Sequence, residues 1–128
     1  VVAIIAEPMQ SEGGERHVSN RFMNRLRALA LAYGVPFIMD EVQTGFFGSG
    51  KPWLWQHKGV APDVVAFGKK AQVCGIYAGP KVDEVEDNVF ERSSRINSTW
   101  GGNLVDMVRC RRFIDGVHDD HLARVPCA

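Results

Sequence analysis

Three apolar runs, each followed within two residues by charged side chains, constrain the fold of this chain more than any other feature. They are VVAIIA at 1–6, VPFIM at 35–39 and DVVAF at 63–67. Continuous runs rich in β-branched residues are typical of strands in a parallel sheet whose two faces are both covered. We therefore predict buried strands in these three places and a fourth, shorter strand at 76–78.

The segment between the first two runs predicts a helix. Apolar side chains recur there at helical spacing, at Phe22, Leu26, Leu29 and Tyr33. Gly34 and Pro36 then end the helix, and the turn-rich loop 11–20 precedes it. Strand, helix and strand together form a β-α-β unit, whose crossover is right-handed almost by rule. We therefore expect an α/β fold with a mainly parallel sheet.

The rest of the chain predicts two further helices. The segment 45–62 is rich in glycine and proline, which indicates a long loop with a short helix around 53–57. A second helix is indicated by the apolar positions Leu104, Met107, Val108 and Ile114. How far this helix continues beyond Ile114 is left open by the sequence.

Composition and charge exclude several classes of function. Fifteen basic residues balance fifteen acidic ones, which argues against binding to nucleic acid or to an anionic membrane. No apolar run is long enough to span a bilayer, and the first residues lack the basic segment of a signal peptide. The three cysteines form no CxxC pair, which predicts reduced thiols and a cytoplasmic location.

The two ends of the chain have separate interpretations. His118 and His121 flank two aspartates, and a solvated chain end explains them better than a metal site does, so we expect no bound metal. A length of 128 residues suits one domain or a piece of one. Because the first residues already form a predicted strand, with no Met before them, we expect a piece cut from a longer protein.

The loop GFFGSGKP at 45–52 favours, on its own, a phosphate-binding loop and an ATPase. Gly45, Gly50 and Lys51 match the pattern G-x-x-x-x-G-K-[ST]. Pro52, however, stands where the pattern needs a hydroxyl for Mg²⁺, and the acidic strand precedes the loop instead of following it. A phosphatase with an aspartate nucleophile would need a second Asp at Val42. We therefore reject both interpretations.

The three strands all end on polar side chains. The first run is followed by Glu7, the second by Asp40, and the third by Lys69 and Lys70. Ligands of an open parallel sheet bind beyond the carboxyl ends of its strands. Pyridoxal phosphate needs a lysine to bind its aldehyde and a carboxylate to keep its ring nitrogen protonated. A buried ion pair between Asp40 and a lysine explains the same residues equally well.

Four sequence blocks give more specific evidence about function than the types of single residues do. In chain order they are EPMQSEGGER, IMDEVQTGFFGSG, PDVVAFGKK and NSTWGGN. Their order and separation resemble the class III (ω-amino acid) pyridoxal-phosphate aminotransferases over nearly the whole chain. The resemblance implies a fold-type-I enzyme, in which residues 1–128 are part of the large, cofactor-binding domain and are incomplete at both ends.

The resemblance also implies a role for individual residues. Asp40 would pair with the pyridine nitrogen, Val42 would pack on the ring, and Gln43 would hydrogen-bond the ring hydroxyl. Lys69 would form the Schiff base with the cofactor, because the separation from Asp40 then matches the family without gaps. Aligning the chain from the glycine at 75 instead would favour Lys70.

Further residues are implied to lie around the cofactor and the substrate. Ser98 and Thr99 would bind the cofactor phosphate of a partner subunit, which makes the enzyme a homodimer. Glu12 would be a gate that pairs with an arginine when an amino donor binds and releases it for a dicarboxylate. Glu7 would hydrogen-bond behind the site. For both glutamates, simple solvation of a loop is the alternative.

Finer features narrow the implied substrate. The blocks FGKKAQVCG, VDEVEDNVF and STWGGN are most similar to family members that act on L-lysine. The implied reaction transfers the terminal amino group of L-lysine to 2-oxoglutarate and gives the 6-semialdehyde and glutamate. An ornithine or 4-aminobutyrate aminotransferase is an alternative, because the arginines that bind substrate carboxylates have no match in the chain. A catalytically silent fragment is the alternative from another class.

Overall fold

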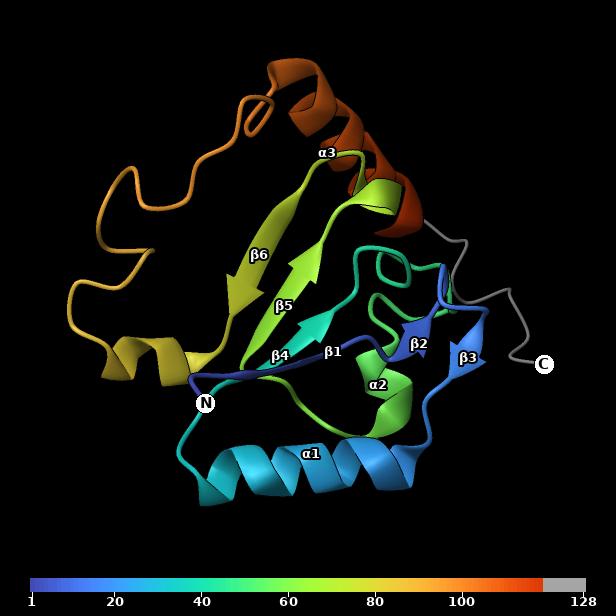
Figure 1. Cartoon of the computed structure of the whole chain (residues 1–128). Coiled ribbons are helices and arrows are strands. Elements are labelled where there is room, and N and C mark those ends of the chain that lie inside the picture. Colours follow the sequence, from blue (N-terminus) through green and yellow to red (C-terminus); the bar gives the residue numbers. More distant parts are fainter. Residues whose placement is uncertain (119–128) are drawn as a thin grey trace.

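The computed structural model describes residues 1–118 and folds them around a four-stranded sheet (Figure 1). The strands, in their order across the sheet, are β1 (Ile4–Ala6), β4 (Phe37–Asp40), β5 (Val64–Phe67) and β6 (Gly75–Ala78). β1, β4 and β5 are parallel to one another, and β6 runs antiparallel to β5. The expected α/β fold with a mainly parallel sheet is confirmed, while the reversed direction of β6 was not predicted.

The helices follow the predicted order. They are α1 (Asn20–Ala32), α2 (Trp55–Lys58) and α3 (Leu104–His118), with 3₁₀ turns at Lys69–Ala71 and Pro80–Glu84. The hydroxyl of Ser19 accepts a hydrogen bond from the amide of Phe22 (3.2 Å) and so caps the start of α1. α3 continues past Ile114 to His118, which answers the question that the sequence left open there; His121 lies outside the described residues.

A short hairpin was missed by the sequence analysis. β2 (Met9–Gln10) pairs antiparallel with β3 (Arg16–His17), and a turn joins them where we expected only a loop. Two residues a strand are too few to show the alternation of apolar and polar side chains that reveals a strand. The hairpin matters because its turn carries Glu12.

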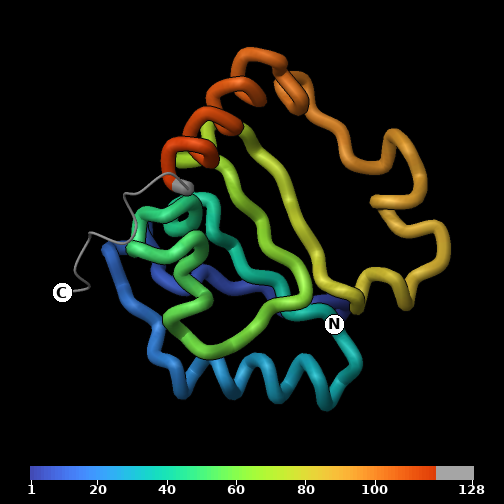
Figure 2. Tube along the Cα trace, turned by 180° about the vertical axis from the view of Figure 1, so that it is seen from behind, coloured from blue at the N-terminus to red at the C-terminus, as the bar shows by residue number. Residues whose placement is uncertain are grey.

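The core lies between the sheet and α1. Phe37 and Met39 of β4 and Val65 of β5 are fully buried, and Met23 and Ala30 of α1 belong to the same cluster. Alternate residues of a strand point to opposite faces, so α1 covers the face of Phe37 and Met39. Both ribbon views show α1 and α3 well apart, with the sheet between them (Figures 1 and 2).

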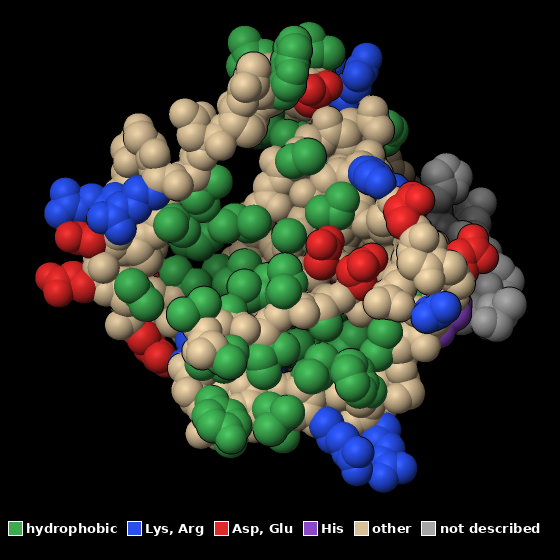
Figure 3. Space-filling view, viewed as in Figure 1, with side chains coloured by type: hydrophobic (Ala, Val, Ile, Leu, Met, Phe, Trp, Pro, Cys, Tyr) green, Lys and Arg blue, Asp and Glu red, His purple; other side chains and the backbone are tan. Residues whose placement is uncertain are grey.

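The first strand departs from expectation. It begins at Ile4, not at residue 1, and the side chains of Val1 and Val2 are exposed. Ile5 is 63% exposed, so the expectation that both faces of this strand are covered is wrong for the described residues. The physical reason is that α1 packs on one face only. Figure 3 shows hydrophobic side chains gathered across one face of the molecule.

An ion pair between α1 and Asp63 lies at the amino ends of β4 and β5. Asp63 is 7% exposed and accepts hydrogen bonds from Arg27 Nη1 of α1 (2.6 Å) and from the amide of Phe37 (2.8 Å). Burial raises the pKa of Asp63, but these two hydrogen bonds and the charges of Arg27 and Lys81 outweigh it and leave the pKa below its ordinary value. The pair holds α1, β4 and β5 together.

No helix within residues 1–118 combines the length and the apolar character that a membrane span requires. The same residues also contain no group of three His, Cys, Asp or Glu side chains placed to hold a metal ion.

Candidate functional site

The polar strand ends meet at one edge of the sheet. Ala6 of β1 pairs with Met39 of β4, and Asp40 pairs with Ala66 of β5, so the three parallel strands end level with one another. Glu7 follows β1 directly, Asp40 is the last residue of β4, and Lys69 lies two residues beyond the end of β5. The sheet thus brings a carboxylate and an amine to neighbouring strand ends.

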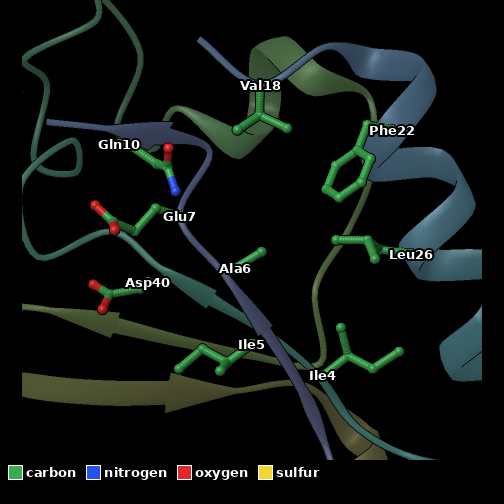
Figure 4. Close-up of a pocket in the computed structure, with 9 residues that line it drawn as sticks. All are labelled: Ile4, Ile5, Ala6, Glu7, Gln10, Val18, Phe22, Leu26 and Asp40. Atoms are coloured by element: carbon green, nitrogen blue, oxygen red, sulfur yellow. The ribbon is translucent and has the colours of Figure 1, made fainter. Parts of the chain in front are cut away.

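Asp40 borders a hollow of about 450 Å³ beside β1. Figure 4 shows the carboxyl groups of Glu7 and Asp40 at the polar end of this hollow, with Phe22 and Leu26 of α1 at its apolar end. Asp40 Oδ1 accepts a hydrogen bond from the amide of Val42 (3.1 Å). This bond fixes the orientation of the Asp40 carboxylate through the turn that follows it.

Val42 borders a second hollow, of about 510 Å³. Ala66 and Phe67 of β5, Cys74 and Ser98 also line it. The hollow therefore lies directly beside the end of β5, where the two lysines follow. A largely apolar wall of this kind suits the face of an aromatic ring.

The residues predicted to sense the substrate and the cofactor contact each other. Gln43 Nε2 donates a hydrogen bond to Glu12 Oε1 (3.0 Å), which joins the hairpin turn to the loop after β4. The carbonyl oxygen of Gln43 in turn accepts a hydrogen bond from Lys70 Nζ. Glu12, Gln43 and Lys70 thus form one polar chain along the edge of the site.

The two candidate lysines differ in their surroundings. Both are exposed and lie in the 3₁₀ turn Lys69–Ala71. The side chain of Lys70 lies along the loop, where a Cβ added at Gly48 would come within 3.1 Å of Lys70 Cε. No hydrogen bond or ion pair joins the Lys69 amine to any of residues 1–118. Within residues 1–118, the Lys70 amine is therefore bound by the loop, whereas the Lys69 amine is not.

The glycine before Lys69 shows how tightly the end of β5 packs. A Cβ added at Gly68 would lie 3.1 Å from Cys74 Sγ and 3.4 Å from Val42 Cγ1. A larger residue at position 68 would therefore require Cys74 Sγ to shift by a few tenths of an ångström, while Val42 would be in ordinary contact. The residues present here fit pyridoxal phosphate: a carboxylate for the ring nitrogen, an apolar side chain for the ring and an amine for the aldehyde.

Ser98 and Thr99 lie in the segment that precedes α3. Both are exposed, and Ser98 borders the same hollow as Val42, whereas Thr99 does not. Figure 2 shows the segment 85–103 leaving the body of the fold as a long excursion before the start of α3. An exposed excursion of this kind is able to reach a second subunit.

One functional candidate was missed by the sequence analysis. Glu41, next to Asp40, is 1% exposed, and its carboxylate accepts three hydrogen bonds, from Thr44 Oγ1 and from the amides of Leu54 and Trp55. Thr44 is near in sequence, but the other two donors are 13 and 14 residues away. Only Thr44, three residues on, was a local signal for this bonding.

An aromatic cluster packs between β5, β6 and the segment that leads into α2. Trp53 packs against Phe67 and Tyr77, with ring centroids 5.7 and 5.0 Å away, and Trp55 Nε1 donates a hydrogen bond to the hydroxyl of Tyr77 (2.9 Å). Burial and the charge of Glu41 raise the pKa of Tyr77, although the bond from Trp55 opposes them. Tyr77 therefore stays neutral and ties β6 to α2.

Known proteins match nearly all of this chain. The family model for class-III aminotransferases matches residues 1–125. L-lysine-epsilon aminotransferase of Mycobacterium tuberculosis is 52% identical over 122 residues, which are 95% of this chain and 27% of that protein. The 4-aminobutyrate aminotransferase of Saccharomyces cerevisiae is 46% identical over 111 residues, which are 84% of this chain and 22% of that protein.

A solved structure of a lysine aminotransferase also matches this chain. Lysine aminotransferase from M. tuberculosis in the internal aldimine form matches with a TM-score of 0.86 and 52% identity. The match covers 92% of this chain and 27% of the solved chain. The chain thus spans about a quarter of the length of the relatives it matches.

Proposed function

This chain belongs to the class-III aminotransferase family, and from that premise we propose that the whole protein is an L-lysine 6-aminotransferase that uses pyridoxal phosphate. It transfers the terminal amino group of L-lysine to 2-oxoglutarate and produces the 6-semialdehyde and glutamate. The observation that carries the proposal is the placement of Asp40 and Lys69 at the carboxyl ends of neighbouring parallel strands, with Val42 beside Gly68. Residues 1–128 are then part of the large, cofactor-binding domain.

Each residue of the site has a separate task in this proposal. Pyridoxal phosphate, when bound, supplies the electron sink that weakens the bonds of the carbon carrying the amino group. Asp40 holds a proton on the ring nitrogen, and its bond from the amide of Val42 keeps the carboxylate oriented for that purpose. Val42 packs on the ring, and Gln43 hydrogen-bonds the ring hydroxyl. Lys69 is the amine that binds the aldehyde.

The choice of amino donor depends on Glu12 and on the relatives. Glu12 is exposed in the hairpin turn and is held by Gln43, so it can leave that bond for an arginine without crossing the core. Lysine is favoured as donor because the relative named for it is 52% identical over 95% of this chain. Because the 4-aminobutyrate enzyme is also 46% identical, 4-aminobutyrate is the second candidate donor.

The proposal includes a homodimer in the cytoplasm. Ser98 and Thr99 of one subunit bind the cofactor phosphate of the partner subunit. Support comes from their exposure and from the apolar neighbours Ile96 and Trp100, which are 54% and 77% exposed and are suited to burial in an interface. The cytoplasmic location is based on the cysteines: within residues 1–118, both Cys74 and Cys110 are unpaired.

Substrate specificity is tested by a panel of donors. The whole protein, loaded with pyridoxal phosphate and 2-oxoglutarate, is given L-lysine, L-ornithine or 4-aminobutyrate, and glutamate formation is followed. We expect kcat/KM for L-lysine to exceed that for the other two donors by at least about tenfold, which is about 1.4 kcal/mol of barrier. A faster reaction with either rival would reassign the donor, and no glutamate from any donor would overturn the proposal.

The identity of the reactive amine is tested by borohydride reduction of the loaded protein and peptide mapping. The cofactor label should appear on Lys69 and should be lost in Lys69→Ala. Lys70→Ala is the matched control, since Lys70 lies in the same turn but is held by Gln43 and packs along Gly48. A label on Lys70 would contradict the assignment.

A further inference from the structure

We infer that Glu41 is a positioning residue for the cofactor site: its buried carboxylate holds the turn that presents Asp40, Val42 and Gln43. The inference rests on the proposed function, because it concerns the same site. Glu41 itself faces neither hollow at the strand ends and touches none of the reacting groups. It acts through the backbone that carries them.

The bonding of Glu41 is complete on both of its oxygens. Oε2 accepts hydrogen bonds from Thr44 Oγ1 (2.9 Å) and from the amide of Leu54 (2.8 Å), and Oε1 accepts from the amide of Trp55 (2.6 Å). Burial of a carboxylate is costly unless hydrogen bonds replace its water. Three donors do so here, and bonds to an ionised acceptor are stronger than neutral ones. Two distant segments of chain are thereby joined.

The backbone around Glu41 is clamped as well. Its amide donates to the carbonyl oxygen of Ala66 on β5 (2.9 Å), and its own carbonyl oxygen accepts from the amide of Gly45 (2.9 Å). A Cβ added at Gly45 would lie 2.6 Å from the ring of Trp53, so the turn is pressed against the segment before α2. The turn 41–45 is held between β5 on one side and residues 53–55 on the other.

Asp40 and Glu41 are adjacent but have different roles: Glu41 holds the turn, and Asp40 faces the hollow. Adjacent side chains of an extended strand point to opposite faces, so the inward direction of Glu41 sends Asp40 outward, toward the hollow shared with Glu7. Asp40 also takes its hydrogen bond from the amide of Val42, inside the same turn. Displacement of the turn would therefore move the carboxylate, the apolar wall and Gln43 together.

The donor pattern requires a carboxylate at this position. Because Leu54 and Trp55 donate their amides to different oxygens, both oxygens must be acceptors. A glutamine has the same shape but offers only one oxygen, and its NH₂ group would face an N–H donor. Glu41→Gln should therefore loosen the turn without changing its volume.

The test compares two buried carboxylates in the whole protein. Asp63→Asn is the matched control for Glu41→Gln, since Asp63 is also nearly buried and also accepts from a backbone amide, but at the opposite end of the strands. Three quantities are measured: the melting temperature without cofactor, amide hydrogen exchange over 41–55 without cofactor, and the Kd for pyridoxal phosphate by titration.

We expect both variants to lower the melting temperature and only Glu41→Gln to affect the site. Its exchange should become faster at residues 42–45, and its Kd for pyridoxal phosphate should rise at least about tenfold, or about 1.4 kcal/mol. Thr44→Val removes one of the three donors and should raise the Kd about threefold, which keeps the test decisive if Glu41→Gln does not fold.

Two results are decisive against the inference. In the first, wild-type protein binds pyridoxal phosphate and Glu41→Gln has the same Kd as wild type; Thr44→Val takes its place if Glu41→Gln does not fold. This result would overturn the inference and leave the proposed function standing. Wild-type protein that binds no pyridoxal phosphate would overturn the proposed function, and this inference with it.

Discussion

The two ends of the parallel strands each bury one carboxylate, and they use it differently. At the amino end, Asp63 accepts from the guanidinium of Arg27 and the amide of Phe37, so its charge is neutralised by a cation. At the carboxyl end, the partners of Glu41 within residues 1–118 are only a hydroxyl and two amides. One carboxylate joins a helix to the sheet, and the other orders a turn that displays polar groups.

Because of this difference, we expect the residues at the amino ends of the strands to contribute to stability and those at the carboxyl ends to contribute to the chemistry of the site. The amino end directs its ionised groups inward and pairs them. The carboxyl end directs Asp40 outward, beside a hollow that a ligand can enter, and leaves Lys69 exposed. In open parallel sheets, ligands bind beyond the carboxyl ends, where the helices and loops leave room for them. Substitutions at the two ends should therefore affect different measurements.

The largest effect on turnover is expected from Asp40→Asn. An amide cannot hold the ring nitrogen protonated, so kcat should fall about a thousandfold or more, which is about 4 kcal/mol of barrier, while cofactor still binds. Steady-state kinetics and absorbance of the bound cofactor check this. Asp83→Asn, an exposed aspartate in the 3₁₀ turn Pro80–Glu84, is the control. Activity within about tenfold of wild type would reduce Asp40 to a structural residue.

The next largest effect is expected at the amino end, and on stability. Arg27→Met leaves Asp63 buried without its cation, which should lower the free energy of unfolding by about 3 kcal/mol. Kd for the cofactor should not change. Arg25→Met, on the exposed side of the same helix, should cost less than about 0.5 kcal/mol. Denaturant unfolding measures both, and equal losses would show that the pair does not fasten the strands.

A smaller effect should appear in acid. The pKa of Asp63 is lower in the folded state than its ordinary value of 3.8, so the folded state favours the ionised carboxylate. That stabilisation is complete above the unfolded pKa and is lost as the pH falls through the folded pKa. Unfolding curves from about pH 6 to about pH 2 should show wild type approaching Asp63→Asn as the pH falls. Parallel curves would contradict the role of this charge.

The smallest effect is expected from Glu12→Ala, at the exposed rim of the carboxyl end. Without the glutamate, an arginine that it masks would be left open to carboxylates of either substrate, so the L-lysine half-reaction should slow about fivefold more than the 2-oxoglutarate half-reaction, or about 1 kcal/mol. Single-turnover rates measure each half-reaction. Glu12→Gln, which keeps an acceptor for Gln43, is the control. Equal losses in both half-reactions would make Glu12 a residue of loop structure only.

Much of the fold could be predicted because its signals are local. Apolar runs predicted β4 and β5, and the helical spacing that begins at Phe22 predicted α1. The apolar positions that begin at Leu104 predicted α3. Periodicity of this kind depends only on side chains within one element. The hairpin β2–β3 and the reversed direction of β6 were not predicted, since pairing partners and strand direction depend on residues elsewhere in the chain.

The candidate site divides along the same line. The order of residues along the chain already shows which polar residues follow the strands, and hence that Asp40 and Lys69 would lie at one edge of the sheet. The bond from Lys70 to Gln43, the bond from Gln43 to Glu12, and the burial of Glu41 and Asp63 could be seen only in the folded molecule. A charged side chain can be buried only where donors from distant segments replace its water, and those donors come together only when the chain folds.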